Sequence, residues 1–424
     1  MPPVGTFTSS YKQALADLAQ CPVDSYKKYL AKDQVWSGLT IFDSRRGMAR
    51  LATDSILNPK PASLDVLVEH EVTRVRIRDG RAECVNFVKA PTKPDPVGKF
   101  VARSPTNERR VCASTIILSA GAILSPDILF KSGVGPRDTI RELGVNLVHE
   151  IDALGRNTYD RVLHPVVTYD KLYSNASIAS VLGMSARGTE CDEYTPFTRK
   201  DCHMIPTEEL GGGRNAEGVL LATRFILPPR FRDTFIADRV FSLLRKCSKN
   251  NHNLLCRMLE PVRECFGRMR AIFYFTSEIH SRGKITYDNG RLSVRANYLQ
   301  DPKDYQQAIA GSQLLSDVIR SGRLDDHAEL DGNNSCPMKM FSALNLVIGG
   351  FGVDLPIADG GKKIATFPPV LPSSDPEAFV TTYMQSIWHW GGSAALGSVV
   401  DSNFNVNGIS SLKIVDASVL PVMT

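Results

Sequence analysis

A run of β-branched residues that leads into glycine and then into helix signals constrains the fold of this chain most strongly. Residues 114–118 read STIIL, which is typical of a buried strand, and residues 119–121 read SAG. Farther on, Ser125 can cap a helix, Pro126 suits its first position, and Gly133 can end it in a left-handed conformation. A buried strand, a glycine turn and a short helix together predict an α/β domain.

Turn and helix-end residues upstream and downstream of residues 114–133 predict further secondary-structure elements. Downstream, Pro136 and Gly144 predict the start and the end of a second helix. Upstream, Asp79 and Gly80 form a turn of the type that closes a tight hairpin between strand-like segments. Residues 89–109 are rich in Pro, Lys and Ser, which predicts a surface loop.

The second half of the chain indicates antiparallel strands. Residues 161–270 are the least informative, with a loop at 211–213 and an amphipathic helix predicted at 239–247. Residues 271–299 return to strand character and contain an Asn289-Gly290 hairpin turn, which predicts an antiparallel sheet. A helix over about 302–321, ended by Gly322, follows this sheet.

Composition excludes several classes of protein. The 424 residues are 43% hydrophobic and 22% charged, which is ordinary for a globular chain of more than one domain. The net charge of +5 is spread along the chain and forms no basic stripe, so we expect no nucleic-acid partner. The apolar stretch at 344–353 is about half of the roughly 20 residues that span a bilayer, so we expect no membrane span.

The nine cysteines contain no CxxC pair, so we expect no metal site. Two features hint instead at a secretory compartment, namely a cluster of cysteines and two glycosylation sequons at Asn175 and Asn333. The clustered cysteines are Cys191, Cys202, Cys247, Cys256 and Cys265. Buried thiols and chance sequons explain the same pattern equally well.

Three segments resemble the glucose-methanol-choline (GMC) family of oxidoreductases. Residues 121–135, GAILSPDILFKSGVG, are similar to the second signature of that family. Residues 388–393, WHWGGS, followed by 412–421, LKIVDASVLP, resemble its catalytic-histidine segment and its closing flavin-contact segment. A weaker likeness to the substrate-domain sheet lies in Ser281, Gly283, Asn297, Tyr298, Leu299 and Asp304.

This resemblance implies a domain organisation and a cofactor. The fold expected is α/β plus an antiparallel sheet, in which a partial Rossmann-like FAD-binding domain is interleaved with a substrate-binding domain. Residues 41–160 and 385–424 are expected in the FAD-binding domain, and 1–40 and 161–384 in the substrate-binding domain. The G-x-G-x-x-G turn that holds the FAD pyrophosphate has no match here. We therefore expect a fragment that lacks the N-terminal FAD-binding βαβ unit and the extreme C-terminus of the family, completed by a longer gene or by a separately encoded N-terminal half.

The resemblance also implies site residues. His389 occupies the position of the catalytic base, and a histidine suits this role because its unperturbed pKa is near 6.5. Trp388, Asp416 and Ala417 lie where the family contacts the flavin, and Val72 lies where its strand contacts the adenine. The alternatives are a core histidine at 389, a capping Asp416 and a structural valine at 72. Asn157 and Asp160 fall in a segment that leads toward the cofactor, or they close local turns.

These residues imply FAD-dependent oxidation of an alcohol, in which a hydride passes to the flavin. One alternative is a hydroxynitrile lyase of the same family, which would use His389 only for acid-base chemistry on a cyanohydrin. A second alternative is a non-catalytic binding remnant that has lost the cofactor site.

Overall fold

The computed structural model describes residues 60–90, 107–169, 279–323 and 376–422 continuously, together with short strand and helix segments elsewhere. The chain divides into two compact units. Unit 1 comprises Met1–Arg50, Val162–Ser277 and Tyr305–Gln385. Unit 2 comprises Leu51–Arg161, Glu278–Asp304 and Ser386–Thr424. The structure thus groups 278–304 with unit 2, and the assignment of FAD and substrate to separate domains stays a prediction.

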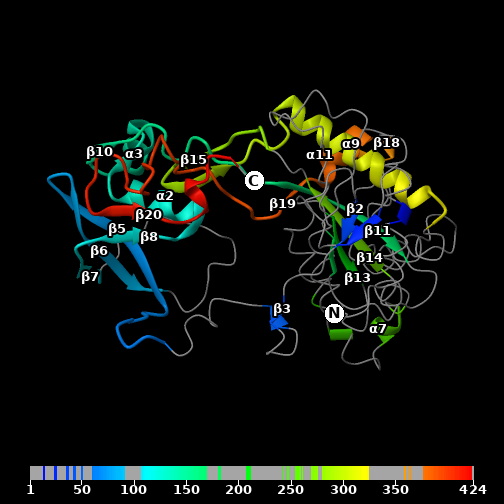
Figure 1. Cartoon of the computed structure of the whole chain (residues 1–424), viewed down its shortest axis with the longest axis horizontal. Helices are drawn as coiled ribbons and strands as arrows, with labels where there is room; N and C mark the ends of the chain where they lie inside the picture. Colours follow the sequence, from blue (N-terminus) through cyan, green and yellow to red (C-terminus); the bar gives the residue numbers. More distant parts are fainter. Residues whose placement is uncertain are drawn as a thin grey trace. The chain divides into compact units, whose positions relative to one another are not determined.

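Unit 2 is built from small sheets around one helix, α2 (Figure 1). Its antiparallel sheet has the order β5-β6-β7, and β8 pairs in parallel with β20, a strand from the other end of the sequence. The strands of these two sheets are β5 (His70–Arg78), β6 (Arg81–Lys89), β7 (Arg109–Cys112), β8 (Ile116–Leu118) and β20 (Leu412–Ile414). The other elements are α2 (Gly121–Lys131), β9 (Val134–Gly135), α3 (Arg137–Leu143), β10 (His149–Glu150), β15 (Lys284–Asp288), β16 (Arg291–Arg295) and the 3-10 helix η5 (Ala417–Val419).

The predicted turns and helix ends in this unit are confirmed. The Asp79-Gly80 turn joins β5 to β6, and the Asn289-Gly290 turn joins β15 to β16. Both residues of each turn have positive φ, between 49° and 70°, which is the geometry that a two-residue hairpin requires. The glycines expected at helix ends are left-handed, namely Gly133 and Gly144 in unit 2 and Gly322 in unit 1.

The predicted start of α2 is wrong. The helix begins at Gly121, with Ala120 as its N-cap residue, so that Ser125 and Pro126 lie inside it. Ser125 is fully buried, and its hydroxyl donates to Asp416, which lies 291 positions away. A long-range partner therefore replaces the local capping role that the sequence suggested.

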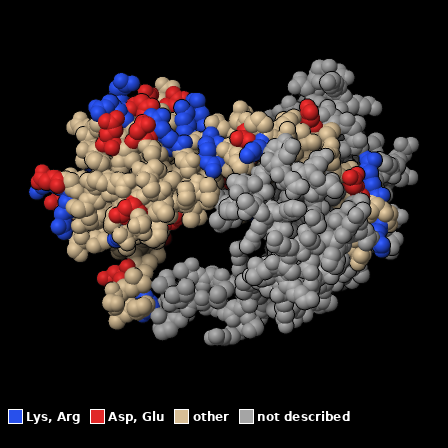
Figure 2. Space-filling model, turned by 45° about the horizontal axis from the view of Figure 1, so that its top comes forward, with Lys and Arg blue, Asp and Glu red and all other residues tan. Residues whose placement is uncertain are grey.

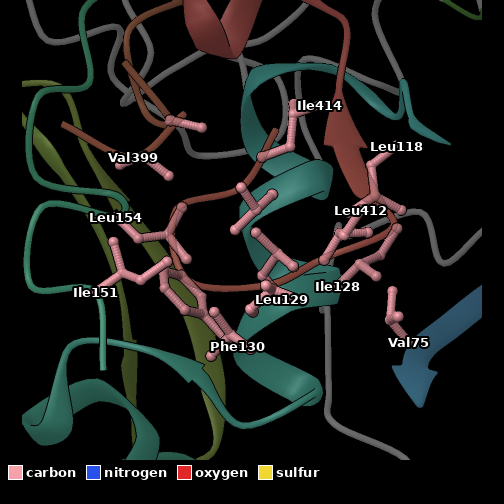
Figure 3. Packing of buried hydrophobic residues seen from close by; sticks show 14 of the residues in the cluster. Val75, Leu118, Ile128, Leu129, Phe130, Ile151, Leu154, Val399, Leu412 and Ile414 are labelled. Carbon is pink, nitrogen blue, oxygen red and sulfur yellow. The ribbon is translucent and has the colours of Figure 1, made fainter. Parts of the chain in front are cut away.

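In the described part of unit 2, an apolar core surrounds α2 (Figure 3). Leu129 and Phe130 of the helix are fully buried against Leu412 and Ile414 of β20 and their neighbours. The expectation of a buried strand at 114–118 holds only in part. The strand is β8, and its Ile116 and Leu118 are buried, whereas residues 114 and 115 are exposed and Ile117 is 56% exposed. Other members of the core are Val75, Leu118, Ile128, Ile151, Leu154 and Val399.

Unit 1 contains a five-stranded sheet of order β12-β13-β14-β11-β19. These strands are β12 (Ser180–Leu182), β13 (Thr207–Gly211), β14 (Met269–Phe275), β11 (Val162–Tyr169) and β19 (Gln385–Ser386), whose last residue belongs to unit 2. The helices are α7 (Leu254–Met258), α11 (Pro376–Tyr383) and α9 (Pro302–Arg320), whose first three residues belong to unit 2. Short strand pairs are β1 (Val23–Ser25) with β2 (Val35–Ser37), β3 (Phe42–Asp43) with β4 (Ala49–Arg50), and β17 (Ala358–Asp359) with β18 (Lys362–Lys363).

The single antiparallel sheet expected over 271–299 is divided between the units. β14 pairs with β11 and β13 in unit 1, whereas the β15–β16 hairpin stands apart in unit 2. Most of the predicted loops at 89–109 and 211–213 and most of the predicted helix at 239–247 lie outside the described residues.

Basic and acidic side chains are interspersed on the visible surface of unit 2 (Figure 2). Several form exposed ion pairs, such as Arg137 with Glu150 and Arg156 with Asp138. Among the described helices, none combines the length and the hydropathy that a bilayer span needs.

A histidine is buried in unit 1 without any exposed surface. The Nε2 atom of His164 in β11 lies 2.9 Å from the carbonyl oxygen of Val380 in α11, and its Nδ1 atom has no hydrogen-bond partner. The imidazole stacks on Tyr274, at 5.1 Å between ring centroids. Burial lowers the pKa of His164 from 6.5 to about 4. The ring is therefore neutral in the folded protein at pH values where the unfolded chain already binds a proton.

This difference predicts an acid-sensitive stability. Because the folded-state pKa is lowered, the stability is complete above the unfolded pKa and falls as the pH drops from 6.5 toward 4. Between about pH 7 and about pH 5, His164 should lower the free energy of unfolding by about 2 kcal/mol. The measurement is urea denaturation at both pH values for the wild type and for His164→Phe, which keeps an aromatic ring but cannot titrate.

The His164→Phe protein should lose that part of the pH dependence. Tyr274→Phe is the matched control, because it keeps the stacked ring and removes only a hydroxyl that donates to Ala308. An unchanged pH dependence in His164→Phe would contradict this account.

Candidate functional site

The segment that carries His389 is hydrogen-bonded through its main chain to two other segments of unit 2. Tyr159 and Gly391 exchange N–H···O bonds of 3.1 and 3.0 Å. The N–H of Ala394 donates to the carbonyl oxygen of Ser418 at 2.8 Å, and the N–H of Gly392 donates to that of Ala417 at 3.4 Å. The structure therefore brings together the histidine segment and the 416–421 segment, as the resemblance implied.

A tyrosine ring supports the glycines that follow His389. Tyr159 is 1% exposed, and its hydroxyl donates to the carbonyl oxygen of Leu420 at 3.1 Å. A Cβ atom at Gly391 would lie 2.5 Å from this ring, and one at Gly392 would lie 2.4 Å from the carbonyl oxygen of Asn157. Only glycine at both positions allows the histidine segment to lie this close to Tyr159.

The carboxylate of Asp416 joins the 416–421 segment to the start of α2. Its Oδ2 atom accepts from the N–H of Gly121 at 2.9 Å and from the hydroxyl of Ser125 at 2.5 Å. Its Oδ1 atom accepts from the N–H of Ser418 at 2.8 Å, which caps η5. A negative charge at the N-terminus of a helix is also favoured by the helix dipole.

A proline and a serine make a second link to α2. Pro126 has no N–H, so the carbonyl oxygen of Ala122, four positions earlier, lacks its helical donor. The hydroxyl of Ser393 donates to this oxygen at 2.5 Å and is fully buried. The helix-disrupting property of Pro126 thus provides an acceptor for the histidine segment.

His389 itself is exposed, although its main chain is held firmly. Its N–H donates to the Oδ1 atom of Asp160 at 2.8 Å. The preceding residue, Trp388, is 63% exposed and has a φ of 61°, a left-handed conformation that is uncommon for a tryptophan. The imidazole therefore projects from a fixed and unusual backbone turn.

Asp160 is a buried carboxylate that the sequence did not single out as essential. It is 2% exposed, and its Oδ2 atom accepts from the hydroxyls of Tyr298 at 2.6 Å and Ser386 at 2.5 Å. Burial raises the pKa of Asp160, and these hydrogen bonds oppose that rise. Burial and the nearby carboxylate raise the pKa of Tyr298, so the phenol keeps its proton. No local pattern predicts these partners, which lie 138 and 226 positions from Asp160.

Val72 lies elsewhere in unit 2. It is half-buried at an irregularity in β5 and packs against the apolar core. The N–H of Val75, in the same strand, donates to the hydroxyl of Ser132 at the C-terminal end of α2. That end is roughly 15 Å from Gly121, given the rise of an α-helix. The described contacts therefore bring together Trp388, His389, Asp416 and Ala417, while a cofactor role for Val72 stays a prediction.

These contacts leave an open surface beside a rigid backbone. Trp388, His389, Ala417 and Leu420 are exposed, whereas the main chain beneath them is hydrogen-bonded and packed on Tyr159. Such a surface can bind a group with an apolar face and present an imidazole to it. Among the described residues, no group of His, Cys, Asp and Glu side chains is arranged to hold a metal ion.

Removal of the hydrogen bonds that the Asp416 carboxylate accepts should strongly lower the stability of unit 2. Asp416→Ala should lower the free energy of unfolding of unit 2 by about 2–4 kcal/mol, because two donors of α2 and one of η5 lose a charged acceptor. Chemical denaturation measures this loss. Asp401→Ala is the control, since Asp401 also accepts three hydrogen bonds, but only from Asn403 and Asn405 within its own turn. Equal losses in the two variants would show that Asp416 acts only locally.

Comparisons with known proteins agree with this geometry. Family models described as GMC oxidoreductase match residues 31–163 and 280–424. Protein HOTHEAD of Arabidopsis thaliana is 24% identical, over 90% of this chain and 58% of its own length. The (R)-mandelonitrile lyase-like protein of the same plant is 22% identical, over 98% of this chain and 63% of its own. An alcohol dehydrogenase [acceptor] of Pseudomonas putida is 22% identical, over 85% and 54% of the two chains.

Solved structures show the same fold. A formate oxidase variant from Aspergillus oryzae superposes with a TM-score of 0.63 at 15% identity, over 99% of this chain and 66% of its own. This likeness confirms the α/β fold class. The chain spans only about half to two thirds of the curated relatives' lengths, 58%, 63% and 54% for the three above. Both matched regions contain segments of the site, and the chain belongs to the GMC oxidoreductase family, whose cofactor is FAD.

Proposed function

We propose that this chain forms the catalytic half of an FAD-dependent oxidoreductase that acts on an alcohol, with His389 as the base. The observation that carries the proposal is the junction of three segments, 121–126, 388–394 and 416–420. Main-chain bonds and the Asp416 carboxylate join these segments. His389 is exposed at that junction.

The residues at this junction fit a flavin. Trp388 and Leu420 are 63% and 50% exposed, so they offer an apolar surface that a flat ring system would cover. At the start of α2, a Cβ atom added to Gly121 would meet nothing within 4 Å, which leaves open space beside this residue, whose N–H donates to Asp416. We propose that Trp388 and the main chain at Ala417 contact the ring system, while Asp416 holds that main chain in place.

The chemistry assigned to the protein is proton transfer and orientation. Oxidation of an alcohol removes a proton from oxygen and a hydride from carbon, and bound FAD supplies the hydride acceptor. The imidazole of His389 would take the hydroxyl proton of the substrate, and the exposed side chain is accessible to it. The bonded main chain on both sides of His389 limits its motion and so favours one orientation toward the substrate.

We infer that the pyrophosphate of FAD is held by residues outside this junction. The N-terminus of α2, the usual kind of phosphate site, is already filled by the Asp416 carboxylate. The exposed side chain of Ile117 in β8 supports a further covering segment, because parallel strands are normally buried on both faces. A longer gene product or a separately encoded N-terminal half would supply both features.

We also propose that the chain folds in an oxidising compartment. Two disulfides support this proposal, Cys84–Cys112 and Cys247–Cys256, and the second lies within the cysteine cluster noted in the sequence. In native protein, alkylation with and without a reductant should find these four cysteines protected until reduction. Full alkylation of all nine cysteines before reduction would contradict the proposal.

Cyanohydrin cleavage is a second candidate, because one of the relatives is a mandelonitrile lyase-like protein. That reaction needs the same base but no net hydride transfer. The absorbance of the flavin distinguishes the two candidate reactions, because only oxidation of an alcohol reduces and so bleaches the flavin.

The base role of His389 predicts a specific kinetic defect. In FAD-loaded protein, His389→Ala and His389→Asn should each lower the rate of flavin bleaching by an alcohol roughly 10²–10⁴-fold, because neither side chain can take a proton. Flavin content should stay near that of the wild type. The measurement is stopped-flow absorbance in the absence of oxygen.

The control for this experiment is His149→Asn, a histidine substitution in β10 of the same unit. It should bleach close to the wild-type rate. Wild-type rates in both His389 variants would show that the base lies elsewhere. Cyanide release from a cyanohydrin, without bleaching by any alcohol, would favour the lyase.

A further inference from the structure

In the backbone turn that leads into His389, three successive N–H groups are hydrogen-bonded. The N–H of Ile387 donates to the carbonyl oxygen of Arg161 at 3.4 Å, and that of Trp388 donates to the hydroxyl of Ser386 at 3.0 Å. The N–H of His389 donates to Asp160, as described above. Because the left-handed conformation of Trp388 is unfavourable for a residue with a side chain, it persists only where its surroundings hold it.

One carboxylate connects these bonds. Asp160 accepts the N–H of His389 directly through Oδ1. Through Oδ2 it accepts the hydroxyl of Ser386, whose oxygen in turn accepts the N–H of Trp388. Asp160 therefore binds the two peptide groups that flank the α-carbon of Trp388, one directly and one through Ser386.

Other contacts keep this carboxylate in place. The hydroxyl of Tyr298 donates to Oδ2 at 2.6 Å, and the ring of Tyr298 packs at 6.3 Å from that of Trp390, on the other side of His389. Tyr159, the residue before Asp160, pairs with Gly391 through two main-chain bonds. With 2% of its surface exposed, Asp160 cannot exchange these donors for water.

We propose that Asp160 is the positioning residue of the site, which holds the left-handed turn at Trp388 and so fixes the direction in which His389 projects. This inference rests on the proposed function of His389 as a base. Asp160 bonds the main chain of His389 directly and that of Trp388 through Ser386, and we assign its effect on the imidazole to these main-chain bonds. Because Asp160 is buried, solvent does not readily replace the lost acceptor, so its removal should free the turn.

The first test follows the His389 amide itself and needs neither flavin nor substrate. Trp388 and His389 form the sole Trp-His pair in the sequence. Labelling tryptophan with ¹³C at the carbonyl and histidine with ¹⁵N therefore isolates one amide resonance. Asp160→Ala should lower the hydrogen-exchange protection of this amide roughly ten- to a hundredfold, because a charged acceptor is lost. Asp160→Asn keeps an oxygen acceptor and should lose less than about tenfold.

The chain offers a closely matched control. Asp304 is also 2% exposed, belongs to unit 2 and accepts two main-chain N–H groups, from His280 and Ser281. Asp304→Asn should leave the protection of the His389 amide unchanged. Unchanged protection in Asp160→Ala, or an equal loss in Asp304→Asn, would overturn the proposal.

The second test measures the consequence for the reaction. In FAD-loaded protein, Asp160→Ala should slow flavin bleaching roughly ten- to a hundredfold at saturating alcohol, with KM and flavin content near those of the wild type. Asp160→Asn should recover most of the rate. A defect confined to KM, or a failure of Asp160→Asn to recover more than Asp160→Ala, would overturn the positioning role. An inactive wild type would refute the proposed function, and the amide measurement would then decide on the turn alone.

Discussion

The candidate site depends on the hydrogen bonds that the carboxylate of Asp416 accepts. This carboxylate accepts hydrogen bonds from Gly121 and Ser125, which lie 295 and 291 positions earlier in the sequence, and from Ser418 beside it. The parallel pairing of β8 with β20 brings Asp416 close to the start of α2, because the two strands end side by side at Leu118 and Ile414. One short pair of strands and one carboxylate thus join residues 116–125 to residues 412–416.

The segment that carries His389 is hydrogen-bonded both to the 416–421 segment and to α2. Main-chain bonds connect it to Ala417 and Ser418, and the buried hydroxyl of Ser393 reaches the carbonyl that Pro126 leaves open in α2. Two glycines allow the segment to lie on Tyr159. A polar, exposed imidazole is therefore carried on a backbone that has little freedom, which is the arrangement that proton transfer needs.

Local features of this fold were predictable from the sequence. The hairpins at Asp79-Gly80 and Asn289-Gly290 and the helix end at Gly133 depend on positive φ values that glycine and its neighbours supply. The start of α2 was not predictable, because Ser125 looks like a local cap until its distant partner is known. Strand character at 271–299 was visible in the sequence, but its division between two units depends on which strands pair.

In the candidate site, too, some residues could be predicted from the sequence and others could not. Resemblance to a family marked Trp388, His389, Asp416 and Ala417, and the structure brings these four residues together. The Asp160 network could not be predicted, because its hydroxyl donors come from positions 298 and 386, and only the folded chain brings them to one carboxylate. A short buried cluster of this kind leaves no periodic pattern in the sequence.

The most direct test of the central claim is a crystal structure of the protein with FAD bound. The flavin ring should lie against Trp388 and Ala417, with the imidazole of His389 facing it across the space for a substrate. A flavin bound elsewhere in the protein, with His389 remote from its ring, would contradict the account.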